Sequence, residues 1–442
     1  MEKVEIQPTS SEVTRLYLAA LVSMSFLVAG TLIYPDYLVS VGIRVGSFRI
    51  SPIGALFVCA APAVTWFSWK QRGLLQRRAL DIVLISAIIF VVIRGVIAAT
   101  NGNELGLVVG YAGYVILLYY GMAVIGQYKY GLRTMFIVLV SMGIIAAAYA
   151  VLEFALDRNI LYGNIIKEEM IPISPVRGPG YHRSGSTLGH PGALGAFMVQ
   201  SIPFFLFFFI RAGTAARKAA WGFGIVLVFV SLLLTYSKGA WSTAAILLIS
   251  GLIWLIWKRP ASTRALLFLL LAVVLVLGVF TTSFYETVHA GTLSKARTGE
   301  SFNPRIYMWS RVPATFMANP LVGAGMWQGN SEVFKVNPAP EAKNRPVSID
   351  NIYLVALVEQ GALGVLLVGA ALTLIGLQAW KLIRRGGLAA VWGLPVAVSM
   401  TAILINGYAM SSLMIWPNMV VFWLCAGMIR SQVERSHELN GE

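Results

Sequence analysis

The sequence contains few charged residues and very few cysteines. Only 12% of its 442 residues are charged, whereas 57% are hydrophobic, and the mean hydropathy is +0.75. A typical soluble domain has about 25% charged residues, so this composition excludes an ordinary soluble protein. The two cysteines, Cys59 and Cys425, both fall in apolar stretches, and we expect neither a disulfide nor a metal cluster. The composition predicts an all-α integral membrane protein.

Long apolar runs recur along the chain. A hydrocarbon core of about 30 Å requires about 20 residues of helix. We predict about twelve spans, at residues 16–33, 53–69, 82–99, 105–126, 134–156, 192–210, 219–236, 240–257, 265–282, 352–377, 389–404 and 412–428. Residues 1–15 show no cleavable-signal pattern, so we expect the first span to remain as an anchor. We therefore expect one polytopic domain over residues 1–442, interrupted by long polar loops at 157–190 and 284–349.

Lysine and arginine residues predict how this domain is oriented. Each short loop on one side carries a basic cluster, as in 70–78 and 381–385, which predicts that these loops and both termini are cytoplasmic. The two long polar loops then share the opposite face. The net charge of +15 does not indicate nucleic acid, because topology accounts for much of it. The basic residues left on the outer face suit an anionic ligand at the membrane surface, such as a lipid phosphate.

Three charged residues lie inside predicted spans: Arg94 in the third, Glu153 near the outer end of the fifth and Glu359 in the tenth. A charge in a span is expensive and usually faces a partner or a water-filled cavity. We expect Arg94 and Glu153 to form a structural ion pair, with a substrate-facing Arg94 as the alternative.

The first long loop ends in VRGPGYHRSGSTLGHPGALG (176–195), whose glycines and prolines argue against regular helix. We expect Pro191 to open the sixth span, since proline suits the first position of a helix. The residues around Arg183 and His190 allow two interpretations. Either they cap and turn the chain while Arg183 meets lipid headgroups, or they form a backbone and guanidinium surface for phosphate or sugar.

A tight turn joins the seventh and eighth spans at TYSKGAW (235–241), with Lys238 at its tip. By itself, one lysine at a helix end is an ordinary interface anchor. The second long loop contains NPRIYMW, in which Arg305 and Trp309 share one face if the segment is helical, whereas Arg311 falls on another face.

That second loop closes on Asp350 and Asn351, and Tyr353 follows one turn into the tenth span. An aspartate at this place could simply cap the helix. Taken alone, the position favours the cap over a catalytic role.

In combination these segments resemble the O-antigen ligase and polymerase family of bacterial surface-polysaccharide assembly. The resemblance rests on RSGSTLGHPGALG, TYSKGAW, NPRIYMW followed by NPLVGAG, and DNIYLVALVEQGALG, and it covers roughly residues 180–380. It implies a multispanning inner-membrane glycosyltransferase that resembles the large membrane (GT-C-like) class. Such enzymes take a glycan from undecaprenyl pyrophosphate on the periplasmic side and pass it to an acceptor hydroxyl, with inversion and without a cofactor or metal.

The resemblance also implies roles for individual residues. The arginine of the family's short turn falls on Lys238, the arginine of the loop-opening motif on Arg305, and the histidine before the Asn-x-Tyr-Leu signature on Asp350. Lys238 keeps the charge but lacks the bidentate fork of arginine. Asp350 is a weaker base than histidine but can still accept a proton. The implied catalytic residues are therefore Asp350, Arg305 and Lys238.

These roles fit the chemistry of transfer from a pyrophosphate. Basic side chains would stabilise charge on the leaving group, and Asp350, or His190 in its place, would take the acceptor's proton. The residues expected to bind substrate are Arg183, His190, Arg311, Asn351 and Tyr353.

Three functions remain open from the sequence. We favour a polymerase that joins lipid-linked repeat units of O-antigen or exopolysaccharide, working beside a flippase and a chain-length regulator. A ligase that attaches finished glycan to lipid A core differs only in the acceptor. Twelve spans also suit a secondary transporter, but the sequence shows no repeat of two related halves, and its largest loop is extracytoplasmic and lopsided in position.

Overall fold

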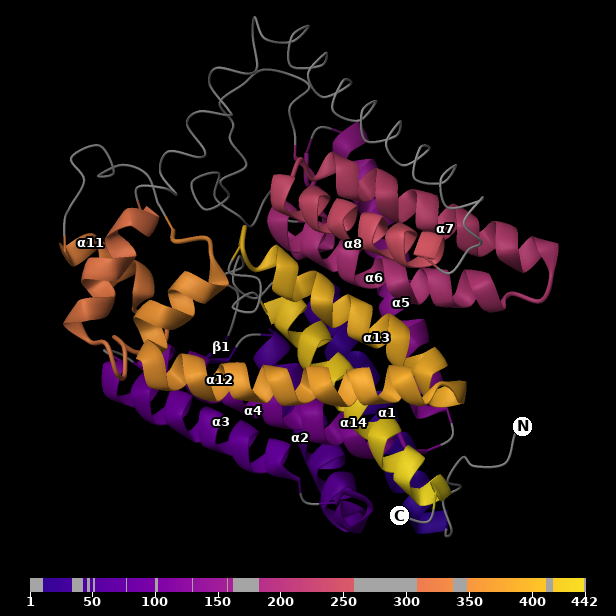
Figure 1. The fold of residues 1–442 in the computed structure, drawn as a ribbon, viewed down its shortest axis with the longest axis horizontal. Coiled ribbons are helices and arrows are strands. Elements are labelled where there is room, and N and C mark those ends of the chain that lie inside the picture. Colours follow the sequence, from indigo (N-terminus) through magenta and orange to yellow (C-terminus); the bar gives the residue numbers. More distant parts are fainter. Residues whose placement is uncertain are drawn as a thin grey trace, which may run out of the picture.

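The computed structural model describes residues 11–33, 43–45, 48–50, 52–76, 78–99, 102–128, 130–156, 158–161, 183–257, 308–336, 348–410 and 416–440. These residues form a bundle dominated by helices (Figure 1). The helices are α1 (Ser11–Ile33), α2 (Pro52–Lys70), α3 (Ala79–Ala98), α4 (Gly102–Ile125), α5 (Gly131–Ala155), α6 (Pro191–Arg211), α7 (Ala215–Leu234), α8 (Lys238–Trp257), α11 (Gly329–Val336), α12 (Ile352–Arg385), α13 (Gly387–Asn406) and α14 (Trp416–Asn440), with short 3-10 helices η1 (Arg72–Leu74) and η2 (Ser186–Leu188). A further helix covers residues 308–318.

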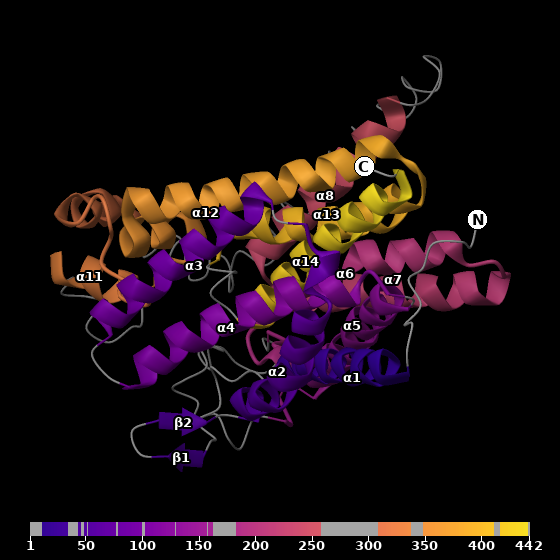
Figure 2. The same cartoon turned by 90° about the horizontal axis from the view of Figure 1, so that it is seen from below.

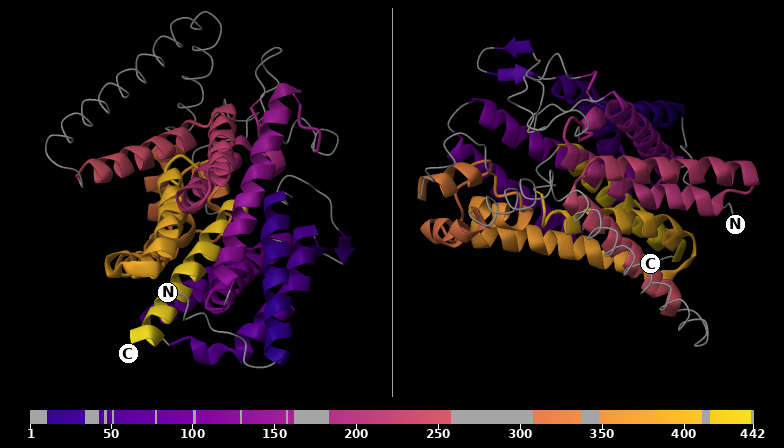
Figure 3. Two further views of the ribbon diagram at one scale, coloured as in Figure 1. Left: turned by 90° about the vertical axis from the view of Figure 1, so that its right-hand side faces the viewer. Right: turned by 90° about the horizontal axis from the view of Figure 1, so that it is seen from above.

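One small hairpin interrupts this helical architecture. Strands β1 (Ile43–Val45) and β2 (Phe48–Ile50) pair antiparallel, with Ile43 opposite Ile50. The hairpin projects from the edge of the bundle near α2 and α4 (Figures 2 and 3). The expectation of an all-α chain is therefore correct for the bundle but misses this element.

Seven of the described helices are long and apolar enough to cross a membrane: α1, α3, α4, α5, α6, α7 and α12. Four other predicted spans coincide with the helices α2, α8, α13 and α14. That these four helices cross the membrane remains a prediction. The predicted span at 265–282 lies outside the described residues. The structure therefore supports a membrane protein, while the count of twelve remains a prediction.

Helix α14 lies at the centre of the core. It packs against α4, α13, α12 and α6, and nearly every residue from Pro417 to Glu434 is buried (Figure 2). Phe422 and Met428 are fully enclosed, as is Tyr119 on α4. A helix that is buried on all sides needs apolar side chains all round, and this helix has them over most of its length.

Ion pairs join several helices at one end of the bundle. Lys70 of α2 pairs with Glu12 at the start of α1, and Arg430 near the end of α14 pairs with Asp81 of α3 at 3.1 Å. The start of α1 and the end of α14 therefore lie at the same end, away from α11 (Figure 1). This geometry agrees with a topology that puts both termini on one side; which membrane face that is remains a prediction.

The segment predicted as a long polar loop at 284–349 contains two helices in its described part, helix 308–318 and α11. They form a small core of their own with the start of α12, in which Met308, Val333 and Ile349 are fully buried. The segment between the two spans therefore contains helix, as the shared face of Arg305 and Trp309 allowed, while its place outside the membrane stays a prediction. The few apolar side chains of this segment meet only after it folds back on itself, so no long apolar run marked it in the sequence.

Helix α12 is broken within the predicted span 352–377. Gly361 has φ 61° and ψ −171°, which is not helical. The loop 319–325 lies against this break: the N–H groups of Ala324 and Gly325 donate to the carbonyls of Val358 and Glu359, at 2.8 Å each. Two further hydrogen bonds run from α12 back to the loop. The backbone groups released by the break are thus satisfied by another part of the chain, as a membrane environment requires.

Candidate active site

The helices α8 and α12 both begin at the turn that follows α13. This turn (residues 407–410) accepts a hydrogen bond at the Gly407 carbonyl from the N–H of Ile352, the first residue of α12, at 2.9 Å. On its other side, a methyl group placed on Gly239 in the first turn of α8 would lie 2.5 Å from Cβ of Ala409. The absence of a side chain at Gly239 therefore lets α8 begin directly on this turn.

Helix α6 begins at the same place. A methyl group on Gly192 would lie 2.7 Å from Sδ of Met410, and one on Gly195 would lie 2.7 Å from Cβ of Ala240 in α8. The N-termini of α6, α8 and α12 thus converge on the turn 407–410. Each of these N-termini carries a partial positive charge, which stabilises anions, while the first N–H groups of α6 and α12 are already bonded within the protein.

Lys238 is the first residue of α8, and its side chain is exposed. The turn that presents it is held by Arg183, whose Nε donates to the Thr235 carbonyl at 3.0 Å and whose Nη2 donates to the Tyr236 carbonyl at 3.4 Å. Sequence reasoning expected Arg183 to meet substrate or lipid phosphate. The structure places its guanidinium on the turn that carries Lys238, and binding of substrate or lipid phosphate by Arg183 stays a prediction.

Residues 184–189 are buried, and their backbone binds an internal carboxylate. Glu153 accepts hydrogen bonds from the N–H groups of Gly185 at 3.3 Å and Ser186 at 2.6 Å, and from the side chain of Asn159 at 3.1 Å. A backbone surface for phosphate was one of two interpretations of this segment. These two N–H groups are already occupied by Glu153, so the segment is a buried structural support.

The expected ion pair between Arg94 and Glu153 is wrong. Arg94 donates from Nε to the Val322 carbonyl at 3.1 Å and from Nη2 to the Gly323 carbonyl at 2.5 Å. Glu153 instead binds the segment that precedes α6. A charged side chain in a helix can bond to the backbone of a loop and need not meet an opposite charge. Sequence position alone does not show which loop supplies those backbone groups.

His190 caps α6, and Pro191 is the first helical residue, as expected. The Nδ1 atom of His190 accepts hydrogen bonds from the N–H groups of Gly192 at 3.1 Å and Ala193 at 3.4 Å. Because Nδ1 is an acceptor, the proton of the neutral ring lies on Nε2. This arrangement makes Nε2 a donor and argues against His190 as a substitute for Asp350 in taking a proton.

Asn351, and not Asp350, caps α12. Its Oδ1 accepts from the N–H groups of Tyr353 at 3.0 Å and Leu354 at 3.2 Å. Asp350 has a positive φ of 43°, and its carboxylate accepts a hydrogen bond from the hydroxyl of Ser348. The interpretation of Asp350 as a simple cap is therefore wrong, and its carboxylate sits at the junction of the loop and α12.

Helix 308–318 is fixed beside this junction by Trp309. The indole Nε1 donates to the Ile349 carbonyl at 2.6 Å, and the ring packs edge-on against Tyr408 of the turn, with centroids 5.5 Å apart. Arg311, predicted to bind substrate, lies on this helix and is partly buried. Arg305 lies outside the described residues.

Tyr353 ties α12 to α13 through its hydroxyl, which donates to the Leu404 carbonyl at 2.5 Å. Its ring is half exposed. Sequence reasoning named Tyr353 but missed the turn 407–410 and the contact of Trp309 with Tyr408. The signal was present as INGYAM (405–410), a glycine-containing break between two apolar runs.

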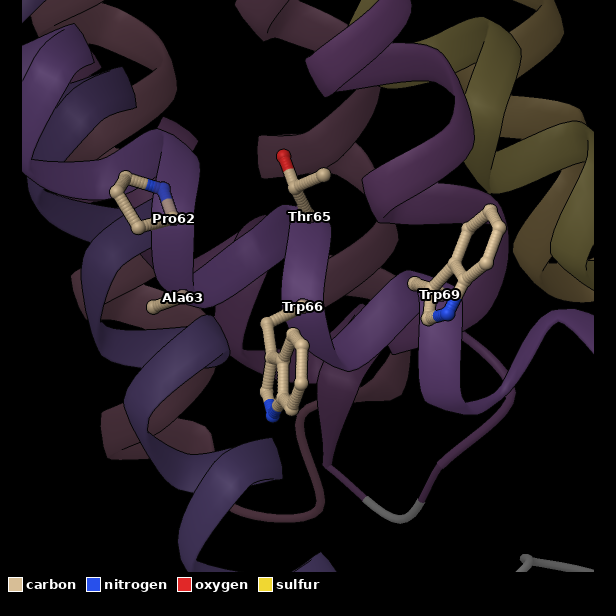
Figure 4. Close-up of a pocket in the computed structure, with 5 residues that line it drawn as sticks. All are labelled: Pro62, Ala63, Thr65, Trp66 and Trp69. Atoms are coloured by element: carbon tan, nitrogen blue, oxygen red, sulfur yellow. The ribbon is translucent and has the colours of Figure 1, made fainter.

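Two hollows in the described part of the chain have apolar walls. One is a depression on α2 lined by Pro62, Ala63, Thr65, Trp66 and Trp69 (Figure 4). The other lies between α12, α13 and α14, with Leu372 and Leu404 among its lining residues. Neither contains the charged residues of the converging helix N-termini, so the candidate site is defined by that convergence.

Fold and site together define a multi-helix membrane protein in which Lys238 and Arg183 lie beside converging helix N-termini. A family model described as O-antigen ligase matches residues 223–369. This part of the chain is an O-antigen ligase family domain, which confirms the resemblance inferred from the motifs. No curated protein matches the chain.

The matched residues contain Lys238, Arg305, Arg311, Asn351 and the neighbouring Asp350, whereas the Arg183 and His190 segment lies outside them. The family connects the protein with the assembly of surface polysaccharide at a bacterial membrane. Its activity is of the ligase or polymerase type, acting on a lipid-linked glycan and an acceptor.

Proposed function

We propose that the protein is a glycosyltransferase that extends O-antigen or exopolysaccharide, moving a glycan from undecaprenyl pyrophosphate to an acceptor sugar hydroxyl on the periplasmic face. One observation carries the proposal: three helix N-termini meet at the turn 407–410, with Lys238 and Asp350 beside them, and two of these helices begin within the O-antigen ligase family domain.

The first requirement of this reaction is to stabilise the leaving group. The bond between the anomeric carbon and the pyrophosphate oxygen breaks, and the pyrophosphate takes the electron pair. Lys238 would face that charge, assisted by the partial positive charges at the N-termini of α8 and α12. Arg305, which the family resemblance places in the same role, would add a bidentate contact.

The second requirement is to activate the acceptor. The acceptor hydroxyl oxygen forms a bond to the anomeric carbon from the face opposite the leaving group, and its proton passes to the carboxylate of Asp350. This geometry inverts the anomeric centre. Asp350 suits the role because Asn351 serves as the cap and leaves the aspartate at the surface of the junction.

The acceptor decides between polymerase and ligase. The family description favours the ligase, whereas the aspartate in place of the ligase histidine supports a polymerase. Purified protein would be reconstituted in liposomes with a short undecaprenyl-pyrophosphate-linked repeat unit, and glycan length would be read on a gel. A ladder supports the polymerase.

Lipid A core added to a parallel sample separates the alternatives. A single shifted band that depends on lipid A core, with no ladder, would favour the ligase. Absence of any product with both acceptors would contradict glycan transfer, and uptake into the same vesicles would then test a transporter. Asp350→Ala and Arg305→Ala protein serve as controls, and neither is expected to make product.

A flippase and a chain-length regulator are the partners we propose, since a polymerase needs its donor on the outer face and a limit on product length. We place the protein in the inner membrane with both termini in the cytoplasm. Attaching reporter enzymes after residues 128 and 386 would test this orientation, because both positions should be cytoplasmic.

A further inference from the structure

Arg94 occupies an unusual position for a charged residue. It lies within α3, an apolar helix able to cross a membrane, and it is partly buried. No carboxylate of the described residues forms an ion pair with it; its guanidinium donates instead to the carbonyls of Val322 at 3.1 Å and Gly323 at 2.5 Å. A charge in such a helix is costly, so the contact that retains it has a role.

The loop that Arg94 holds lies directly on α3. Gly325 has φ 106°, and a methyl group placed on it would collide with Cβ of Ala98. A residue with a side chain would therefore push the loop away from α3 and lengthen the hydrogen bonds of Arg94.

The other face of the same loop completes the break in α12. Ala324 and Gly325 donate to the carbonyls of Val358 and Glu359, and the N–H groups of Ala362 and Leu363 donate to the loop at 2.8 and 3.0 Å. The carboxylate of Glu359 is buried and accepts from the N–H of Gly329, beyond the loop, at 3.1 Å. The loop is therefore bonded to both sides of the break.

The loop also connects the two helical segments that hold or adjoin candidate site residues. Helix 308–318, with Arg311, leads directly into it. Residues 352–360, which follow Asp350, extend from the break to the turn 407–410, a helical length of about 13 Å. A shift of the loop relative to α3 would consequently move both helix 308–318 and residues 352–360.

We propose that Arg94 is a positioning residue for glycan transfer: through the loop 319–325 and the break at Gly361, it sets the placement of Asp350 and Arg311 without touching substrate. This inference rests on the proposed function. Arginine suits the task because its planar fork donates to two neighbouring carbonyls at once, whereas a lysine ammonium would hold them less rigidly.

The experiment combines hydrogen exchange with kinetics on full-length protein in nanodiscs. We would compare wild type, Arg94→Ala and Arg94→Lys, with Arg133→Ala, an exposed arginine on α5, as the matched control. Loss of two charge-assisted hydrogen bonds should speed exchange of peptides covering 319–328 and 352–363 about tenfold or more in Arg94→Ala. Arg94→Lys should fall between Arg94→Ala and wild type.

With the lipid-linked donor, kcat of Arg94→Ala should fall about tenfold while KM for the donor stays within about twofold, because a positioning residue makes no substrate contact. Unchanged exchange in Arg94→Ala would overturn the proposal, as would faster exchange with full kcat. A raised KM with unchanged exchange would make Arg94 a substrate-binding residue instead.

A second pair of variants keeps the test valid if Arg94→Ala fails to fold. Gly361→Ala places a methyl group 2.5 Å from the Gly323 nitrogen at a positive φ, whereas Gly376→Ala, further along α12, meets nothing within 4 Å. Only Gly361→Ala should reproduce the faster exchange and lower kcat; equal behaviour of the two would contradict the role of the break. A wild type that transfers no glycan would overturn the proposed function, and the positioning role with it, while the exchange data would still show whether Arg94 holds the loop.

Discussion

The two ends of the bundle neutralise charge in different ways. At one end, the charge-paired end, side chains pair with each other; its residues are Glu12, Lys70, Arg78, Asp81, Arg430 and Glu434. At the other, the converging end, α6, α8 and α12 begin around the turn 407–410.

At the charge-paired end the central residue is Arg430, only 1% exposed. Its guanidinium lies 3.1 Å from Asp81 and 2.8 Å from Glu434, and Glu434 also meets Arg78 at 3.2 Å. Two positive and two negative side chains therefore balance locally. Such a group contributes to structure and leaves little field for a ligand.

Towards the converging end, four charged side chains bond to backbone groups. Glu153 and Glu359 accept from N–H groups, and Arg94 and Arg183 donate to carbonyls. Lys238 is exposed and forms no ion pair within the described residues. The comparison teaches that cancelled charge marks a structural end, whereas positive charge left facing outward marks the end suited to an anionic substrate.

The largest effect is expected at Asp350. Replacement by asparagine keeps the shape but removes the proton acceptor, so transfer should fall on the order of 10² to 10⁴-fold. The liposome ladder assay measures this loss, and an unchanged melting temperature would show that the protein still folds. Polymer of normal yield from Asp350→Asn would remove Asp350 from the active site and weaken the contrast between the two ends.

At the charge-paired end, Arg430→Met should act on stability. It leaves Asp81 and Glu434 without their shared partner in a buried site, which costs about 3–5 kcal/mol in comparable cases. Thermal unfolding in detergent would show the loss. A variant as stable as wild type would mean that these charges are not essential to the structure.

Variants of Lys238 test whether its exposed positive charge acts on the substrate. Lys238→Ala should lower kcat/KM by about 100-fold, the size of effect seen when one preorganised donor is removed from a developing negative charge. Lys238→Arg should be tolerated better because it keeps the charge, and neither should change the melting temperature of this exposed position. Equal losses in both variants would indicate that Lys238 packs and does not bind an anion.

Glu153→Gln tests whether a buried carboxylate near the converging end stabilises the structure or takes part in glycan transfer. The glutamine oxygen can accept only part of the hydrogen bonds that Glu153 receives from Asn159, Gly185 and Ser186, and its amide opposes a donor. We expect a stability loss of about 1–3 kcal/mol, seen as a lower melting temperature. A large loss of transfer at full stability would instead place Glu153 in the reaction.

The smallest effect is expected for Glu12→Gln. Its partner Lys70 is also solvent-accessible, and exposed ion pairs contribute little. Melting temperature and ladder length should match wild type. A clear loss of stability here would show that even the exposed pair supports the charge-paired end.

Local rules explain which site features could be predicted from the sequence. Pro191 opens α6 as expected, because proline at the first helical position is a local preference. The cap of α12 was assigned one residue too early, since Asp350 and Asn351 are both good caps. The contact of Ile352 with Gly407, which fixes where α12 starts, joins residues 55 apart in the chain.

The partners of buried charges could not be predicted. Arg94 and Glu153 are two of the three charges inside predicted spans, yet each is satisfied by a different loop. Backbone carbonyls and N–H groups occur at every position, so sequence alone does not indicate which of them a charged side chain will meet. The same reason hid the role of Gly361, whose conformation is permitted by glycine but required only by the loop packed on it.

The sequence by itself determined that this is a largely helical membrane protein with an O-antigen ligase family domain, because the lengths of apolar runs and the short motifs can be read directly along the chain. Only the tertiary structure decided that α6, α8 and α12 begin together, that Glu153 binds the segment before α6, and that Arg94 bonds to the loop packed on the break in α12. These relations depend on contacts between helices far apart in the chain, which form only when side chains and backbone groups must be satisfied together in the packed bundle.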